Sequence, residues 1–259
     1  MADLATQARG AVLTQHGRRK LNQEIERAAG DLNALLAELD HVKHPRAMFD
    51  PGNPRTIGFF IALVMTAQPR QPLGSMGEFY GSGVYAIYYN GDYPHYEPLR
   101  GTETPIYIGQ AAPGNKNART PVEQGLRLAA RLNEHRKNIE RATSLCIKDF
   151  ECRALVVQTG WEIGAEDYLI RLFQPIWNSE TGLVFGLGKH GDSAGTRRNK
   201  RSPWDTLHEG RVWAAAEMLT DAKSPQEIAD ELTAHFAETK IYKTFDDVLA
   251  GFVEDLRQS

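Results

Sequence analysis

A pair of basic side chains marks one helical segment of this sequence as suited to handling a phosphate. Arg131 and His135 lie four residues apart, so one helix face presents both, one turn from each other. Arg127 extends that line by a further turn. A guanidinium can grip a phosphate through two parallel hydrogen bonds, and an imidazole can hold or pass a proton near neutral pH. The same spacing also occurs on solvated amphipathic helices, so other groups must decide between these interpretations.

Two tyrosines lie in short apolar segments that read as strands. Tyr85 belongs to Gly-Val-Tyr-Ala-Ile-Tyr-Tyr at 83–89, and Tyr107 belongs to Pro-Ile-Tyr-Ile-Gly-Gln-Ala at 105–111. Both segments are rich in β-branched and aromatic residues and are bounded by Gly or Pro. An antiparallel pair of these strands would place both phenols on one small sheet. A phenol has a pKa near ~10, so it is a poor base at neutral pH unless its surroundings help.

A single carboxylate and a later amide complete the set of candidate groups. Glu166 lies early in a predicted helix at 161–173, and Asn178 follows just past Pro175-Ile176-Trp177. One carboxylate above a sheet can hold a hard divalent cation, although a glutamate near a helix start also stabilises the helix dipole. The amide can hydrogen-bond a phosphate, orient a neighbour, or belong to an ordinary loop.

The elements that must position these groups can be read from periodicity, caps and turn residues. Residues 1–42 look helical, with Asp31 as a possible start of a second helix, and the apolar run 57–67 fits a buried strand or a buried helix. The region 80–180 reads as strand, long connection, strand, loop, helix, strand and helix. Its first helix begins at an N-cap, Thr120, with Pro121 at the first helical position and Glu123 closing a capping box. Further predictions are a third strand at 150–158, a loop at 181–204, and helices at 206–220, 225–236 and 245–256.

Composition sets the broad class of protein. The 259 residues are 41% hydrophobic and 24% charged, an ordinary globular balance. No apolar run is long enough to cross a membrane, and the first residues lack a secretory signal, which predicts a cytoplasmic protein. Cys146 and Cys152 are too few for a disulfide framework or a zinc knuckle.

Charge is unevenly distributed along the chain, although the formal net charge is only −3. Acidic residues outnumber basic ones at 213–259, whereas Lys and Arg prevail at 110–141 and 181–212. Two basic segments and an acidic tail are consistent with a DNA-binding groove beside a separate acidic surface. Ordinary solvated charge explains the pattern equally well.

The order of all these features resembles the GIY-YIG nuclease superfamily over about residues 80–180. The matching features are Gly83-Val84-Tyr85, Tyr107-Ile108-Gly109, the helix with Arg131 and His135, a third strand, the helix with one glutamate, and Pro-Ile-Trp-Asn. A histidine one turn after the arginine is similar to the type II restriction endonuclease branch. The segment Ser202–Arg211, read Ser-Pro-Trp-Asp-Thr-Leu-His-Glu-Gly-Arg, looks like the small enzymes of that branch that cut CCGCGG. Val84 in place of isoleucine is a mild departure, and the connection between the tripeptides is longer than in the minimal module.

The resemblance implies an α+β fold, with a small antiparallel sheet flanked by helices and with helical N- and C-terminal extensions. The implied division is an N-terminal arm at 1–79, a catalytic core at 80–180 and a basic loop with a helical extension at 181–259. The implied activity is magnesium-dependent cleavage of double-stranded DNA that leaves 5′-phosphate ends. One Mg²⁺ per site, replaceable by Mn²⁺, would be held by Glu166, and a palindromic target would favour a homodimer. The implied catalytic residues are Tyr85, Tyr107, Arg131, His135, Glu166 and Asn178.

Sequence reading is expected from basic residues outside this core. Arginine and lysine read guanine edges in the major groove, which a target made only of G·C pairs would require. A basic loop that touches only phosphates is the competing interpretation. The candidate DNA-binding residues are Arg127, Lys189, His190, Arg197, Arg198, Asn199, Lys200 and Arg201.

Three other interpretations stay open at this point. A repair-type or structure-specific nuclease could share the same core and cut branched or damaged DNA. A non-catalytic DNA-binding module could keep the fold without the reaction, although the arginine and glutamate positions are both filled. In an unrelated α/β protein the tyrosines would serve only core packing, and the candidate groups would lie far apart.

Overall fold

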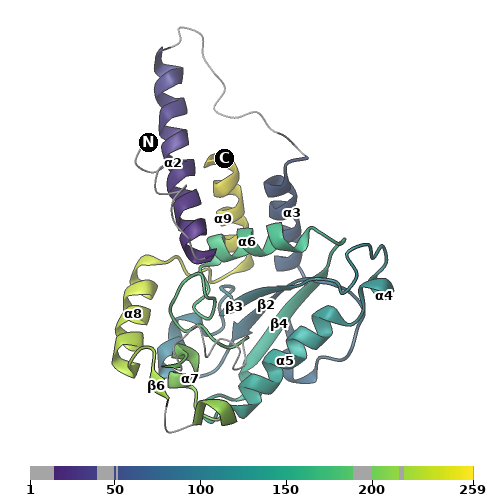
Figure 1. The fold of residues 1–259 in the computed structure, drawn as a ribbon, viewed down its shortest axis with the longest axis vertical. Helices are drawn as coiled ribbons and strands as arrows, with labels where there is room; N and C mark the ends of the chain where they lie inside the picture. The colour runs from purple at the N-terminus through teal and green to yellow at the C-terminus, as the bar shows by residue number, and fades with distance from the viewer. Residues whose placement is uncertain (1–14, 40–49, 51, 189–199, 216–218, 259) are drawn as a thin grey trace. The chain divides into compact units, whose positions relative to one another are not determined.

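The structure is a computed structural model that describes residues 15–39, 50, 52–188, 200–215 and 219–258. The chain divides into two units, residues 1–49 and 50–259. Within the first unit, α2 is one continuous helix over Gln15–Leu39 (Figure 1). The suggested second helix from Asp31 is therefore wrong, because the chain stays helical through Gly30. The domain limits at 79 and 180 stay a prediction.

A four-stranded antiparallel sheet forms the centre of the second unit, in the order β1-β4-β2-β3. Its strands are β1 (Gln71–Pro72), β2 (Gly83–Tyr89), β3 (Tyr107–Ala111) and β4 (Phe150–Val156). The three predicted strands and the antiparallel pairing of β2 with β3 are confirmed. β1 was missed because two residues, one of them proline, carry no strand pattern.

Alternation along β2 divides the core into two layers. Tyr85, Ile87 and Tyr89 join a cluster with side chains of α5 (Arg127–Arg141), α7 (Pro203–Leu207) and α8 (Pro225–Glu238). The alternate residues of β2 join a cluster with α3 (Pro54–Thr66), α6 (Glu162–Phe173) and α9 (Phe245–Gln258). Successive side chains of β2 point to opposite faces, and all seven of its residues are buried, so the sheet lies between two helical layers. The predicted α+β class is confirmed.

The helices that carry the candidate groups differ in one respect from expectation. The helix predicted from Thr120 is two helices, α4 (Pro121–Gln124) and α5, because Gly125 between them has φ of 77°. The Thr120 hydroxyl does accept a hydrogen bond from the Glu123 amide, 3.3 Å away. The Glu123 carboxylate, however, accepts from the Arg119 amide, so the predicted capping box is not closed in the expected way.

Close backbone packing fixes α6 beside α3. The ambiguous apolar run at 57–67 belongs to the helix α3, whose cap is Asn53. A Cβ on Gly58 of α3 would lie 2.6 Å from the carbonyl oxygen of Gly164, so only glycine allows this approach. Gly164 is two residues before Glu166, so this contact holds the N-terminal part of α6, from which Glu166 projects, against α3.

The C-terminal part confirms two predicted helices and corrects a third. The helices α8 and α9 cover the predicted segments at 225–236 and 245–256. A helix at 206–220 is wrong: α7 ends at Leu207, and Val212–Ala215 form a short 3₁₀ turn. The chain turns at Gly210, whose φ is 131°, and this turn brings Arg211 back to Asp205.

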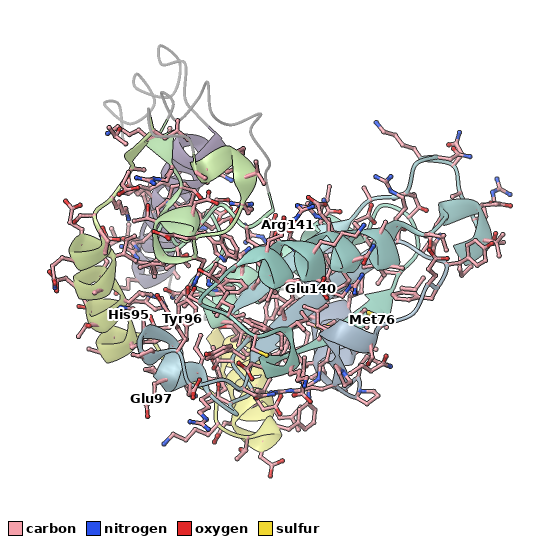
Figure 2. All side chains as sticks on the ribbon, turned by 90° about the horizontal axis from the view of Figure 1, so that it is seen from below. Met76, His95, Tyr96, Glu97, Glu140 and Arg141 are labelled. Atoms are coloured by element: carbon pink, nitrogen blue, oxygen red, sulfur yellow. The ribbon has the colours of Figure 1, made fainter. Side chains whose placement is uncertain are left out.

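Smaller features complete the description. The long connection between β2 and β3 contains a 3₁₀ helix over Pro94–Leu99, on which Figure 2 labels His95, Tyr96 and Glu97. Cys146 is exposed and Cys152 is buried, and both are free thiols. Within the described residues, no helix combines the length and the apolar character that a membrane crossing needs.

Candidate active site

The Tyr85 phenol and the His135 imidazole meet in the interior between β2 and α5. Both side chains are fully buried, and the Tyr85 hydroxyl oxygen lies 2.6 Å from Nε2 of His135. Fifty residues separate them in sequence. The structure therefore brings together two of the six predicted catalytic residues in direct hydrogen-bond contact.

Tyr107 joins this pair from the neighbouring strand. Its ring centroid lies 4.8 Å from that of His135 and 6.1 Å from that of Tyr85. The register pairs Tyr85 with Gly109 and Ile87 with Tyr107, so the two tyrosines are diagonal neighbours on one face of the sheet. The predicted placement of both phenols on one small sheet is confirmed.

Two glycines of the tripeptides serve different purposes. A Cβ on Gly109 would lie 2.4 Å from the Tyr85 hydroxyl, so its missing side chain is the space that the phenol occupies. A Cβ on Gly83 would lie 2.1 Å from the Leu155 carbonyl oxygen, so there it is the β4 backbone that approaches. Gly83 therefore allows a close approach of two backbones, whereas Gly109 makes room for a side chain.

Arg131 lies one turn before His135 on α5 and is partly exposed. Its Nη1 atom donates to a Glu134 carboxylate oxygen at 2.5 Å and to the Gly188 carbonyl oxygen at 3.4 Å. The guanidinium charge also lowers the pKa of both phenols, in opposition to the effect of burial. A cation with one side toward the buried tyrosines and another toward solvent is well placed to meet an incoming anion.

Burial controls the protonation of these groups. Burial raises the pKa of Tyr85 well above its usual value; Tyr107 adds to the rise, and Arg131 opposes it. Burial likewise raises the pKa of Tyr107, with Arg131 opposing and Glu166 adding to the effect. Burial, assisted by the Arg131 charge, holds the pKa of His135 well below its usual value. At neutral pH both phenols are protonated and the imidazole is neutral.

Glu166 reaches the same region from α6 and is partly exposed. Its charge raises the pKa of Tyr107, which places the carboxylate within electrostatic range of that phenol. Among the described residues, no three His, Cys, Asp or Glu side chains gather in a way that would enclose a metal ion. A single carboxylate fits a hard cation such as Mg²⁺, which keeps several of its waters, better than it fits a metal that needs a closed protein shell.

Asn178 contacts the backbone of β3 rather than the tyrosine hydroxyls. Its Oδ1 accepts from the Ile108 amide at 2.9 Å, and its Nδ2 donates to the Ile108 carbonyl at 2.8 Å. The buried amide therefore acts as a strand partner for the residue that follows Tyr107. Of the two functions that the sequence allowed, orienting a neighbour is the one that this geometry serves.

The predicted DNA-binding residues are only partly visible. Arg127 is exposed, and its Nε donates to the Ala112 carbonyl oxygen at 2.9 Å. Lys200 is exposed, whereas Nε of Arg201 pairs with Asp221 at 2.7 Å. The others lie outside the described residues: Lys189, His190, Arg197, Arg198 and Asn199.

Sequence reasoning missed two neighbours of Arg131. Glu134 follows it by three residues, which is a recognised pairing distance on a helix and could have been found. Gly188 lies 57 residues away in a segment without periodicity, and no sequence signal connects it to the arginine.

The fold together with the match to a known family gives the class of protein: a GIY-YIG nuclease, a hydrolase that acts on DNA, in a superfamily that generally uses a divalent metal. The family model described as the Eco29kI GIY-YIG domain matches residues 77–236, which is more than half of the chain. The chain belongs to that family, and the predicted resemblance to the restriction endonuclease branch is confirmed. No curated protein matches the chain in sequence.

Proposed function

We propose that the protein is a type II restriction endonuclease that cuts double-stranded DNA at a specific site, with Tyr85, Tyr107, Arg131, His135 and Glu166 as its catalytic residues. The observation that carries this proposal is the 2.6 Å contact between the Tyr85 hydroxyl and Nε2 of His135, with Tyr107 and Arg131 against it. Core packing alone does not require a phenol and an imidazole to meet beside a partly exposed guanidinium.

The protonation states suggest the path of the proton during hydrolysis. A neutral His135 accepts a hydrogen bond from the Tyr85 hydroxyl at Nε2, which turns a lone pair of the Tyr85 oxygen toward the attacking water, and the water proton passes to solvent. The water oxygen forms a bond to phosphorus, the bond from phosphorus to the 3′ oxygen breaks, and that oxygen takes a proton from solvent. The products are a 5′-phosphate and a 3′-hydroxyl.

Arg131 and Tyr107 stabilise the phosphate as negative charge develops on it. The Arg131 guanidinium binds a non-bridging oxygen, which lowers the free energy of the transition state in a site partly shielded from water. The Tyr107 hydroxyl contacts the phosphate or supports Tyr85. Asn178 holds the Ile108 backbone, and through it positions Tyr107, which makes Asn178 a positioning residue.

Glu166 is the residue proposed to hold one Mg²⁺, with Mn²⁺ as a substitute. When bound there, the cation supplies charge stabilisation to the scissile phosphate and to the leaving 3′ oxygen. The support for this assignment is the position of Glu166 on α6, within electrostatic range of Tyr107.

Base recognition is proposed for the basic residues beyond the catalytic cluster, and the proposed target is CCGCGG. Lys189, His190, Arg197, Arg198, Asn199, Lys200 and Arg201 would contribute to it. Arg127 is exposed one turn before Arg131 and is better suited to a flanking phosphate.

Digestion of a plasmid that contains a single CCGCGG site tests both the activity and the target. With Mg²⁺ we expect one linear product, and mapping of its ends should place the cut inside the site with 5′-phosphates. A matched plasmid with the site changed to CCATGG should stay circular. Cutting of branched DNA alone would favour a structure-specific nuclease. Discrete cuts at another sequence would support a restriction endonuclease but reject CCGCGG as its target.

A homodimer is part of the proposal, because two active sites are needed to cut both strands of a palindrome in one binding event. The helix α2 offers a surface for it. Apolar residues recur there at alternating intervals of four and three, the pattern by which two helices form a coiled coil: Leu21, Ile25, Ala28, Leu32, Leu35 and Leu39. Leu32, Leu35 and Leu39 are 39%, 57% and 80% exposed, so a second copy of the helix could bury them.

The charges beside this stripe favour a parallel arrangement. Glu24, Asp31 and Glu38 recur every seven residues along one flank. An antiparallel pair would set these acids against one another, whereas a parallel pair sets them beside Ala29 and Leu36 of the second copy.

A double substitution on α2, Leu32→Glu with Leu35→Glu, should convert a dimer into a monomer, because four added carboxylates would face one another across the seam. Light scattering after size-exclusion chromatography would measure the molar mass. The control pair Asn33→Glu with Ala37→Glu adds the same charge on the opposite side of α2 and should leave the dimer intact. A dimer that survives the first pair would place the contact elsewhere.

A further inference from the structure

The segment Ser202–Arg211, whose sequence pointed to the restriction branch, forms a buried network around one ion pair. Nε of Arg211 donates to Asp205 at 2.6 Å, and the side chains are 1% and 0% exposed. Ser202 caps α7, and its hydroxyl also bonds the Asp205 carboxylate. The Cζ atom of Arg211 lies 4.7 Å from the centroid of the Trp204 ring. A fully buried ion pair contributes little net stability compared with apolar side chains of the same size, so the contacts that this pair makes matter more than its own energy.

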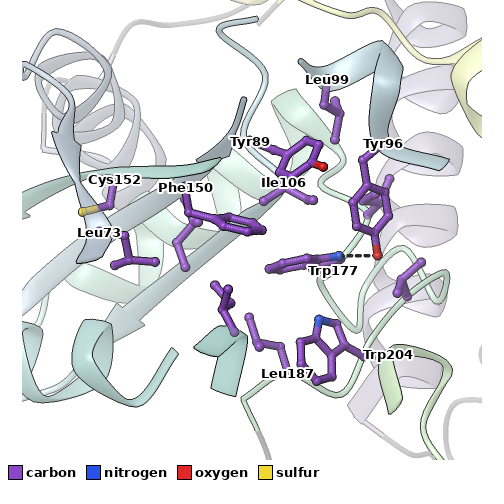
Figure 3. Packing of buried hydrophobic residues seen from close by; sticks show 14 of the residues in the cluster. Leu73, Tyr89, Tyr96, Leu99, Ile106, Phe150, Cys152, Trp177, Leu187 and Trp204 are labelled. Carbon is purple, nitrogen blue, oxygen red and sulfur yellow. Dashed lines mark hydrogen bonds between the residues drawn. The ribbon is translucent and has the colours of Figure 1, made fainter. Parts of the chain in front are cut away.

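The remaining nitrogens of Arg211 hold the two residues just before Gly188, which contacts Arg131. Nη2 donates to the Gly186 carbonyl oxygen at 2.9 Å, and Nη1 donates to that of Leu187 at 3.2 Å. The Leu187 carbonyl also accepts from Asn138 of α5 at 2.9 Å. Figure 3 shows the Leu187 side chain beside Trp204 in the core. Residues 186 and 187 are thus fixed from two sides.

The next carbonyl in this row belongs to Gly188, and it accepts from Arg131. A Cβ on Gly188 would lie 2.8 Å from Nη2 of Arg131 and 3.5 Å from Cε1 of His135. Three successive carbonyl oxygens therefore receive hydrogen bonds from Arg211, from Arg211 together with Asn138, and from Arg131. Gly188 contacts Arg131 through its carbonyl and leaves no room for a side chain beside Arg131 and His135, and the Arg211 network holds the two residues that precede it.

We infer that Arg211 and Asp205 are positioning residues, which act through Gly188 to hold the Arg131 guanidinium in its catalytic orientation. The inference rests on the proposed role of Arg131 in cleavage. It assigns a function to a buried charge pair that touches neither phosphate nor metal. A misplacement of a catalytic group by about 1 Å can reduce a rate by about 100-fold, so small shifts of this segment matter.

The substitution Gly188→Ala tests the inference with the smallest possible change. The added methyl meets the far end of a flexible arginine side chain, so the fold should survive while the guanidinium moves. We expect the single-turnover cleavage rate of plasmid DNA with Mg²⁺ to fall by about 10- to 100-fold. The Kd for the same DNA in EDTA and the melting temperature should change little. The matched control is Gly77→Ala, because a Cβ there meets nothing within 4 Å.

A double-mutant cycle tests whether Arg211 acts through Arg131. Arg211→Lys keeps the charge but loses the fork that binds two carbonyls, and we expect about a tenfold slower cleavage in the otherwise native enzyme. In the Arg131→Lys background the same change should have almost no further effect. Equal effects in both backgrounds, or a native rate for Gly188→Ala, would overturn the inference. A native rate for Arg131→Ala would instead reject the proposed function itself.

Discussion

Glu166→Gln is expected to abolish magnesium-dependent cleavage while DNA binding survives. The substitution keeps the size of the side chain but removes the charge that a hard cation requires, and no cluster of three potential ligands among the described residues could replace it. Plasmid cleavage with Mg²⁺ or Mn²⁺ measures the loss, and gel-shift titration in EDTA measures binding.

A neighbouring carboxylate provides the control for this experiment. Asp167→Asn removes the same charge one residue further along α6, where the side chain is exposed. That variant should cleave at close to the native rate. Turnover by Glu166→Gln at a rate like that of the native enzyme would remove Glu166 from the metal-binding role.

Arg131→Ala should reduce the cleavage rate by about 100- to 1000-fold, because removal of one transition-state donor costs roughly 3–4 kcal/mol. The truncation also leaves the Gly188 carbonyl without this donor and removes the positive charge that opposes the rise in pKa of Tyr85 and Tyr107. Single-turnover rates at saturating enzyme separate this loss from any weakening of DNA binding.

Arg136→Ala is the matched control on the same helix. Arg136 pairs with Glu140 at 3.2 Å and with Asn133, away from the tyrosines. A fall in rate of similar size for both arginines would indicate general loss of positive charge. Cleavage near the native rate for Arg131→Ala would refute the phosphate-clamp assignment.

Local patterns were sufficient to predict the core of this fold. Tyr85 and Tyr107 lie in short runs rich in β-branched and aromatic residues, which predicted both strands, and Arg131 and His135 have the spacing of one helix face. These four side chains come together because β2 pairs with β3 and α5 packs on the sheet. That arrangement was predicted from the order of elements in a known superfamily. The break at Gly125 could have been predicted from a glycine near a helix start, but a capping signal outweighed it.

The Arg211 network could not be predicted, because its meaning lies in contacts between distant segments. Nothing in the sequence indicates that Arg211 turns inward to the Asp205 carboxylate and two backbone carbonyls instead of facing solvent, as most arginines do. The apparent helix at 206–220 hid the turn at Gly210 that makes this possible. Hydrogen bonds between a side chain and a distant backbone segment produce no repeating pattern in the sequence, so periodicity cannot reveal them.

The pairing of Asn178 with Ile108 also affects how the folded chain behaves in crowded solution. β3 is the last strand of its sheet, and an outer strand with unused backbone groups can recruit strands from other molecules. Here the Trp177 amide occupies the Ile106 carbonyl, and the Asn178 side chain occupies both backbone groups of Ile108. The backbone groups on either side of Tyr107 are thereby occupied, which shortens the stretch of this outer strand that a second molecule could pair with.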